Sequence, residues 1–226
     1  MLQSSALAPA PVATSQPGSA ADRGHRHGHD PAPAASPSGP SPVQATADVI
    51  NLIVLMNGTR SIIEMGCTDG PLAPLLSVPS YTGVALNSVT LQACAQRHGT
   101  AEGRRFMTRS ALGHEQADLC LSLDVIPHLA DDATCEHYLH AVFNASRKLV
   151  LIRASNPPEA CASQNGRLHH RPVIRWVEQH RPDFVLLGGS DSAMPASPAP
   201  TPAASPCETA AQFMLFQRIH STPMRG

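Results

Sequence analysis

Short apolar runs alternate with amphipathic stretches through the middle of this chain, and the pattern predicts an α/β fold. Runs such as SIIEM at 61–65 and LVLIR at 149–153 are typical of strands buried in a parallel sheet. The predicted strands cover residues 61–65, 81–86, 104–108, 119–123, 149–153, 184–187 and 212–219. The predicted helices cover residues 45–56, 72–78, 88–97, 131–147 and 172–180, with Thr46 and Ser88 as the expected N-caps of the helices at 45–56 and 88–97.

The order of these elements predicts a mostly parallel sheet with helices on both faces. Strands that alternate with helices form βαβ units, and these build three-layer sandwiches. The last two predicted strands are joined by a loop instead of a helix, so we expect a closing hairpin with an antiparallel final strand. Ligands of such sheets bind beyond the carboxyl ends of the strands, where the strand order reverses. The turn at 64–70 is therefore the expected site.

Two segments rich in Pro, Ala and Ser lie outside this pattern. They contain few apolar side chains that could offset the entropy lost on ordering. We therefore predict a disordered tail over residues 1–43 and a low-complexity surface loop over 190–207. The folded domain is expected to cover residues 44–221, and the low-complexity loop lies within it.

The charge and the cysteine content of the chain limit the partners and the cellular location that we expect. The formal net charge is -1 and only 15% of the residues are charged, so neither nucleic acid nor a membrane surface is an expected partner. No apolar run reaches the roughly 18 residues that span a bilayer. The six cysteines are scattered, which predicts no disulfide scaffold and favours a reducing, cytoplasmic location. No metal site is predicted, and the sequence does not indicate an oligomeric state.

The expected site turn reads EMGCTDG over residues 64–70. Its glycines permit positive φ, and an acid at the end of the strand can accept hydrogen bonds from an amine or a hydroxyl group. A dinucleotide fingerprint that began at Gly66 would need glycine at positions 68 and 71, where this chain has Thr68 and Pro71. No P-loop motif is present. Binding of NAD, FAD or a nucleoside triphosphate through these motifs is therefore not expected.

The same turn resembles the first motif of class I S-adenosylmethionine-dependent methyltransferases, E/D-x-G-x-G-x-G. The segment YTGVALNSVTLQACAQRHG is similar to that family's second strand and helix. The segment ADLCLSLDVIPHLADDATCEHYLHAVFNASRKLVLIRASN is similar to its fourth strand, following helix and fifth strand, and the resemblance covers roughly residues 45–220. It implies a Rossmann-like methyltransferase fold with an antiparallel last strand, and S-adenosylmethionine as the cofactor.

The resemblance also implies roles for individual residues. Glu64 and Gly66 would face the methionine part of the cofactor, and Leu123 and Asp124 would line the side where the methyl group is transferred. Asp124 and His128 are the candidate catalytic residues, because an imidazole with a pKa near 6.5 suits a general base. Their alternative interpretations are a loop cap for Asp124 and a packed side chain for His128. The implied cofactor-binding residues are Glu64, Gly66, Cys67, Gly70, Ala85, Asn87, Leu123 and Asp124.

Three departures from the family pattern leave the activity open. Thr68 replaces the middle glycine, Ala85 replaces the acid that holds the ribose, and Arg109 stands where an acid near the adenine is usual. Asn87 could offer a neutral substitute for the ribose carboxylate. The leading hypothesis is methyl transfer to an unidentified acceptor, most plausibly a small molecule. The alternatives are an inactive domain kept as a binding or scaffold module, and nucleotide or sugar chemistry on the same sheet.

Overall fold

The computed structural model describes residues 40–99, 101–162, 167–191 and 210–219. Contacts divide the chain into Met1–Ser38 and Gly39–Gly226, and every described residue belongs to the second unit. The predicted tail falls outside the described residues except for 40–43, and the predicted loop falls outside them except for 190 and 191. Both regions stay predictions, although the first helix begins at Pro42, slightly before the expected domain start at 44.

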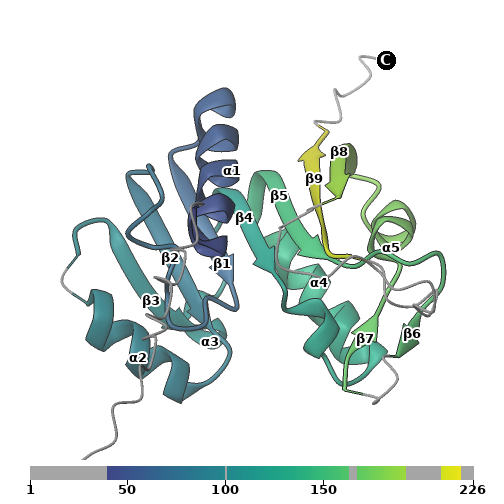
Figure 1. Ribbon diagram of the computed structural model, residues 1–226, viewed down its shortest axis with the longest axis horizontal. Helices are drawn as coiled ribbons and strands as arrows, with labels where there is room; N and C mark the ends of the chain where they lie inside the picture. Colours follow the sequence, from purple (N-terminus) through teal and green to yellow (C-terminus); the bar gives the residue numbers. More distant parts are fainter. Residues whose placement is uncertain (1–39, 100, 163–166, 192–209, 220–226) are drawn as a thin grey trace, which may run out of the picture. The chain divides into compact units, whose positions relative to one another are not determined.

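A seven-stranded sheet in the order β3-β2-β1-β4-β5-β9-β8 forms the middle of the domain (Figure 1). The first five of these strands pair in parallel, and β9 runs antiparallel to both β5 and β8. The predicted mixed sheet with a closing hairpin is therefore confirmed. The strand bounds are β1 Ser61–Met65, β2 Ser80–Ala85, β3 Arg104–Thr108, β4 Ala117–Leu123, β5 Ser146–Ala154, β8 Phe184–Asp191 and β9 Gln212–Arg218. A separate two-stranded sheet pairs β6 Cys161–Ala162 with β7 His169–His170.

The helices agree with the sequence pattern more closely than their caps do. Ser41, not Thr46, caps the first helix, because Pro42 can occupy the first helical position without losing a hydrogen bond. Asn87, not Ser88, caps the second by accepting a hydrogen bond from the N–H of Thr90. The helix bounds are α1 Pro42–Asn57, α2 Ser88–His98, α3 Arg109–Leu112, the 3-10 helix η1 Ile126–His128, α4 Asp132–Asn144 and α5 Val173–His180.

The helix predicted over residues 72–78 is absent. Prolines at 71, 74 and 79 interrupt this segment, and a proline inside a helix removes a hydrogen bond and clashes with the preceding turn. Side chains from elsewhere hold the segment instead. The Arg104 guanidinium donates to the carbonyl groups of Ala73, Leu76 and Val78 at 2.8 to 2.9 Å. Asn51 of α1 bonds to Leu75 O and Ser77 N.

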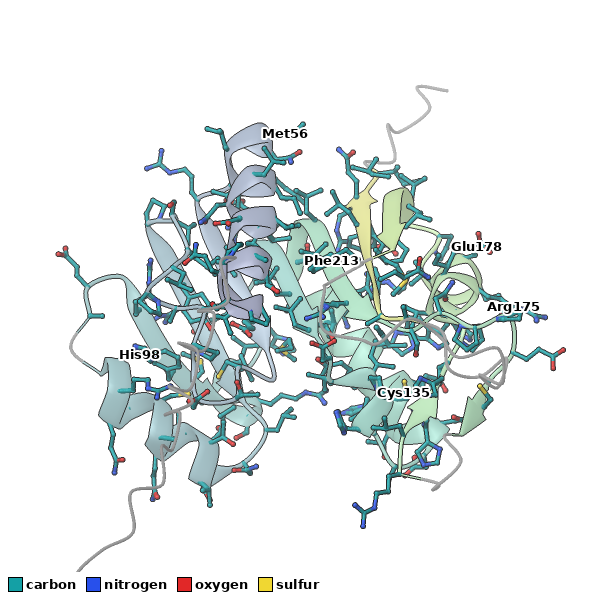
Figure 2. All side chains as sticks on the ribbon, viewed as in Figure 1. Met56, His98, Cys135, Arg175, Glu178 and Phe213 are labelled. Atoms are coloured by element: carbon teal, nitrogen blue, oxygen red, sulfur yellow. The ribbon has the colours of Figure 1, made fainter. Side chains whose placement is uncertain are left out.

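Two apolar cores cover the two faces of the sheet. On one face α1 packs with the 71–78 segment against side chains of β1, β2, β4 and β5. On the other face α4 and α5 pack against the alternate side chains of the same strands. Phe213 of β9, labelled in Figure 2, belongs to the α1 core. Strand alternation therefore places Glu64, Leu123 and Arg153 on the α1 face, at the carboxyl edge of the sheet.

Four cysteines of this domain are free and buried, namely Cys67, Cys94, Cys120 and Cys135. Cys161 is disulfide-bonded, which the sequence analysis did not anticipate. Among the described residues, no helix has both the length and the apolar character needed to cross a bilayer.

Candidate functional site

A cavity of about 470 Å³ lies at the carboxyl ends of β1, β4 and β5, where the strand order reverses. The N-terminal turn of α1, the 71–72 segment and η1 contribute the rest of its wall. Its apolar lining consists of Pro42, Val43, Pro71, Leu72, Leu86, Leu123, Val125 and Leu129. Its remaining lining consists of Thr46, Glu64, Gly66, Thr68, Asp124, His128 and Arg153.

Glu64 brings a carboxyl group to this cavity from the buried end of β1. Its partner is the Tyr81 hydroxyl, which donates a hydrogen bond to Oε2. The sheet register allows this pairing, because Gly83 lies opposite Glu64 and Tyr81 lies two residues earlier on the same face of β2. Burial raises the pKa of Glu64 to about 7, although the Tyr81 hydrogen bond acts in the opposite direction. The carboxyl group is thus poised to change its charge near neutral pH.

The glycine turn after β1 is closed against β2. The N–H groups of Gly66 and Cys67 both donate to Val84 O, at 2.8 and 3.2 Å. Gly66 has a φ of 87°, and a Cβ atom there would lie 2.5 Å from Val125 Cγ2. Glycine is therefore required at 66 both by the backbone conformation and by the close approach of Val125.

Thr68 keeps the backbone conformation of the glycine that it replaces. Its φ is 44°, in the left-handed region that disfavours β-branched residues. The Thr68→Gly variant should therefore be more stable by about 1 kcal/mol, since relief of the strain exceeds the extra entropy of glycine in the unfolded chain. Urea unfolding would measure the gain. Thr90→Gly, within helix α2, is the matched control and should instead lose about 0.5 kcal/mol. A loss of stability in Thr68→Gly would contradict this interpretation.

Asp124 and Arg153 form an ion pair on the opposite side of the cavity. Arg153 Nη1 lies 3.1 Å from Asp124 Oδ2. Asp124 has a φ of 58°, and this backbone conformation follows directly after strand β4. Burial raises the pKa of Asp124, and the positive charges of Arg153 and His128 oppose that rise. His128, at the end of η1, lines the same cavity.

The structure brings together five of the sequence-predicted site residues and leaves four outside. Glu64, Gly66, Leu123, Asp124 and His128 all line the cavity. The residues that do not line it are Cys67, Gly70, Ala85 and Asn87.

The four residues outside the cavity pack against other side chains or form hydrogen bonds elsewhere in the domain. Cys67 and Ala85 pack with Cys94 beneath α2. The His98 ring lies over Gly70, where a Cβ atom would be 2.9 Å from His98 Cδ2. The side-chain oxygen of Asn87, proposed as a ribose ligand, caps α2.

Sequence reasoning missed Tyr81, Val125 and Arg153. Arg153 gave the strongest signal, because it is a charged residue that follows the apolar run LVLI in a central strand. The contacts of Tyr81 and Val125 depend on strand register and on a loop conformation, neither of which the sequence pattern reveals.

Comparisons with solved structures identify the architecture. The chain is similar to magnesium protoporphyrin IX methyltransferase from Synechocystis PCC 6803 with bound SAH, at 13% identity and a TM-score of 0.57, over 78% of this chain and 83% of that one. It is also similar to the methyltransferase domain of bacterial CtHen1-C, at 14% identity and a TM-score of 0.58, over 78% and 98% of the two chains. The N-methyltransferase NodS from Bradyrhizobium japonicum WM9 matches at 12% identity and a TM-score of 0.56, over 80% and 98%. The chain has the class I methyltransferase fold.

Of the comparisons with known proteins, only the one with solved structures gives matches to this chain. No protein-family profile matches the chain, and no curated protein matches it. The fold that the resemblance in the sequence implied is confirmed, including the mostly parallel sheet and the antiparallel last strand. Within this methyltransferase fold, the cavity occupies the carboxyl edge between β1 and β4.

Proposed function

We propose that the protein is an S-adenosylmethionine-dependent methyltransferase that acts on a small molecule. The observation that carries the proposal is the cavity at the strand-order reversal, with a buried carboxyl group on one side and an ion pair on the other. Similar structures include the protoporphyrin and NodS enzymes, described with bound SAM or SAH. S-adenosylmethionine supplies an electrophilic methyl group on a sulfonium ion.

The residues of the cavity fit the methionyl end of this cofactor. The Glu64 carboxylate would bind its ammonium group, and the Gly66 backbone, which also lines the cavity, would lie beside the cofactor. Leu123 and Asp124 would line the side of methyl transfer. Asp124 and His128 are the candidates to hold a proton released by an acceptor, since both line the cavity. The chain's contribution is mainly to orient the two reactants and exclude water.

Calorimetric titration with S-adenosylhomocysteine (SAH) tests this proposal. We expect binding below about 1 mM, and Glu64→Gln should weaken it by about 10- to 100-fold through loss of a charged hydrogen bond. Glu115→Gln is the matched control, because Glu115 pairs with Arg105 at an exposed position outside the cavity. Absence of binding to the wild-type chain at millimolar ligand would favour the inactive binding or scaffold module.

Thr68, Ala85 and Arg109 depart from the methyltransferase pattern in the part of the chain expected to hold the adenosine of the cofactor. The affinity for the adenosine part is therefore the most informative quantity to measure. Arg109 Nη2 lies 2.9 Å from His137 Nε2, and Arg109 does not line the cavity. Methylthioadenosine, which lacks the amino acid end of the cofactor, measures the adenosine contribution separately. A cytoplasmic location stays a prediction.

A further inference from the structure

Arg153 places a fixed positive charge on the cavity wall. It lies near the end of β5, in register with Leu123 on one side and Phe213 on the other. Its guanidinium carbon is 5.7 Å from the centroid of the Phe213 ring, and its side chain is 19% exposed. A guanidinium group carries a delocalised positive charge and a planar fork of N–H donors. The cavity therefore carries this charge.

The guanidinium group is only partly satisfied by the protein. Nη1 donates to Asp124 Oδ2, while Nε is buried and has no hydrogen-bond partner among the described residues. A buried donor without an acceptor is costly, so the protein itself does not fully compensate this guanidinium group. Asp124 is itself 52% exposed and accepts from one nitrogen only, so it does not use the whole donor edge of Arg153.

One side of the cavity carries the Glu64 carboxyl group, and the other carries the Arg153 guanidinium, paired through one nitrogen with Asp124. Glu64 lies on β1 and Arg153 on β5, with strand β4 between them. Most of the surface between these two groups is apolar. A cationic group is thus favoured at the Glu64 side, and an anionic group is favoured at the Arg153 side. The anion that matches a guanidinium fork in shape and charge is a carboxylate or a similar oxyanion.

We propose that Arg153 binds the carboxylate of the methyl acceptor, and that this acceptor is a small carboxylic acid with an apolar body. The proposal rests on the proposed function. A carboxylate oxygen would form the bond to the methyl carbon while the electron pair of the broken carbon–sulfur bond stays on sulfur, which gives a methyl ester and a neutral thioether. The acceptor is already ionised, so this reaction needs no general base and makes no demand on His128.

Binding of octanoate and octanamide to the SAH-saturated protein tests this inference by calorimetry. The two probes share an apolar chain and differ in charge. We expect octanoate to bind at least about 10-fold more tightly than octanamide. Arg153→Leu should remove this difference, and Arg153→Lys should retain part of it because the charge remains without the planar fork. Asp124→Asn should tighten octanoate binding, since it removes the competing carboxylate.

Two controls separate binding from folding. Thermal melting of both Arg153 variants establishes whether they fold, and Arg153→Lys serves as the conservative replacement if Arg153→Leu does not. Arg105→Leu removes an exposed arginine on β3 that lies outside the cavity, so octanoate affinity should not change.

Several outcomes would overturn the inference. Equal affinity for octanoate and octanamide would do so, as would unchanged octanoate affinity in Arg153→Leu. A third is an Arg153→Leu variant that loses affinity for SAH and keeps affinity for methylthioadenosine, because Arg153 would then hold the carboxylate of the cofactor. These results are distinct from failure of the proposed function, which is failure of the wild-type chain to bind SAH. Octanoate binding can be measured without SAH in that case.

Discussion

Glu64→Gln should raise the free energy of unfolding by about 3 kcal/mol at pH 8 and leave it nearly unchanged at pH 4. Burial raises the pKa of Glu64 from its ordinary 4.5 to about 7, so ionisation of the native state is costly. The gap between these two values corresponds to about 3 kcal/mol. Glutamine has nearly the same shape, can still accept the hydrogen bond from Tyr81, and carries no charge at any pH.

The direction of the pH dependence follows from proton uptake. Between pH 4.5 and about 7 the native protein binds more protons at Glu64 than the unfolded chain does. Stability from this residue therefore falls as the pH rises through that window, and the loss is complete above about 7. The wild type should lose stability across the window relative to Glu64→Gln.

Urea unfolding of both proteins at several pH values would measure the difference. Glu115→Gln, at an exposed ion pair, is the control and should give a small difference with little pH dependence. A constant difference between Glu64→Gln and the wild type from pH 4 to pH 8 would show that the Glu64 pKa is not raised. Greater stability combined with weaker SAH binding would show that the carboxylate is kept for binding at the expense of stability.

Gly66→Ala should lower the free energy of unfolding by about 3 kcal/mol. The substitution places a Cβ atom 2.5 Å from Val125 Cγ2 and puts a non-glycine residue at a φ of 87°. The backbone contributes about 1 to 2 kcal/mol and the overpacking a comparable amount. Chemical denaturation measures the sum.

A control and a rescue separate these two contributions. Gly58, after α1, has a φ of 58° and a ψ of 35° with open space where its Cβ would be, so Gly58→Ala should show the backbone cost alone, about 1 kcal/mol. Adding Val125→Ala to Gly66→Ala should recover about 1 to 2 kcal/mol beyond additivity. Equal losses for Gly66→Ala and Gly58→Ala would mean that the contact with Val125 is readily relieved.

The sequence pattern predicted the sheet because local signals sufficed there. The run LVLIR is apolar at every position except the last, as expected of a strand covered on both faces, and β5 contains it entirely. The closing hairpin followed from the missing helix between the last two strands. The helix predicted over 72–78 is wrong because the apolar spacing there is typical of a helix, whereas the prolines within and beside the segment prevent one.

For the candidate site, the sequence pattern predicted only which residues stand at the ends of neighbouring strands. Glu64, Gly66, Leu123 and Asp124 end strands that meet at one edge, so their convergence follows from the parallel order. The residues at the end of β2 were expected beside them, but the side-chain oxygen of Asn87 is taken by a helix cap. Such competition between local hydrogen bonds and a ligand site is invisible in a spacing pattern.

The proline-interrupted segment after the glycine turn has a consequence for how substitutions spread through this protein. Its conformation is dictated by Arg104, a residue near the far edge of the sheet that donates to three of its carbonyl groups. Pro71 and Leu72 of this segment form part of the cavity wall, while Arg104 does not. The shape of the cavity therefore depends partly on a residue outside it, so that substitutions on the outermost parallel strand can alter a wall that they do not contact.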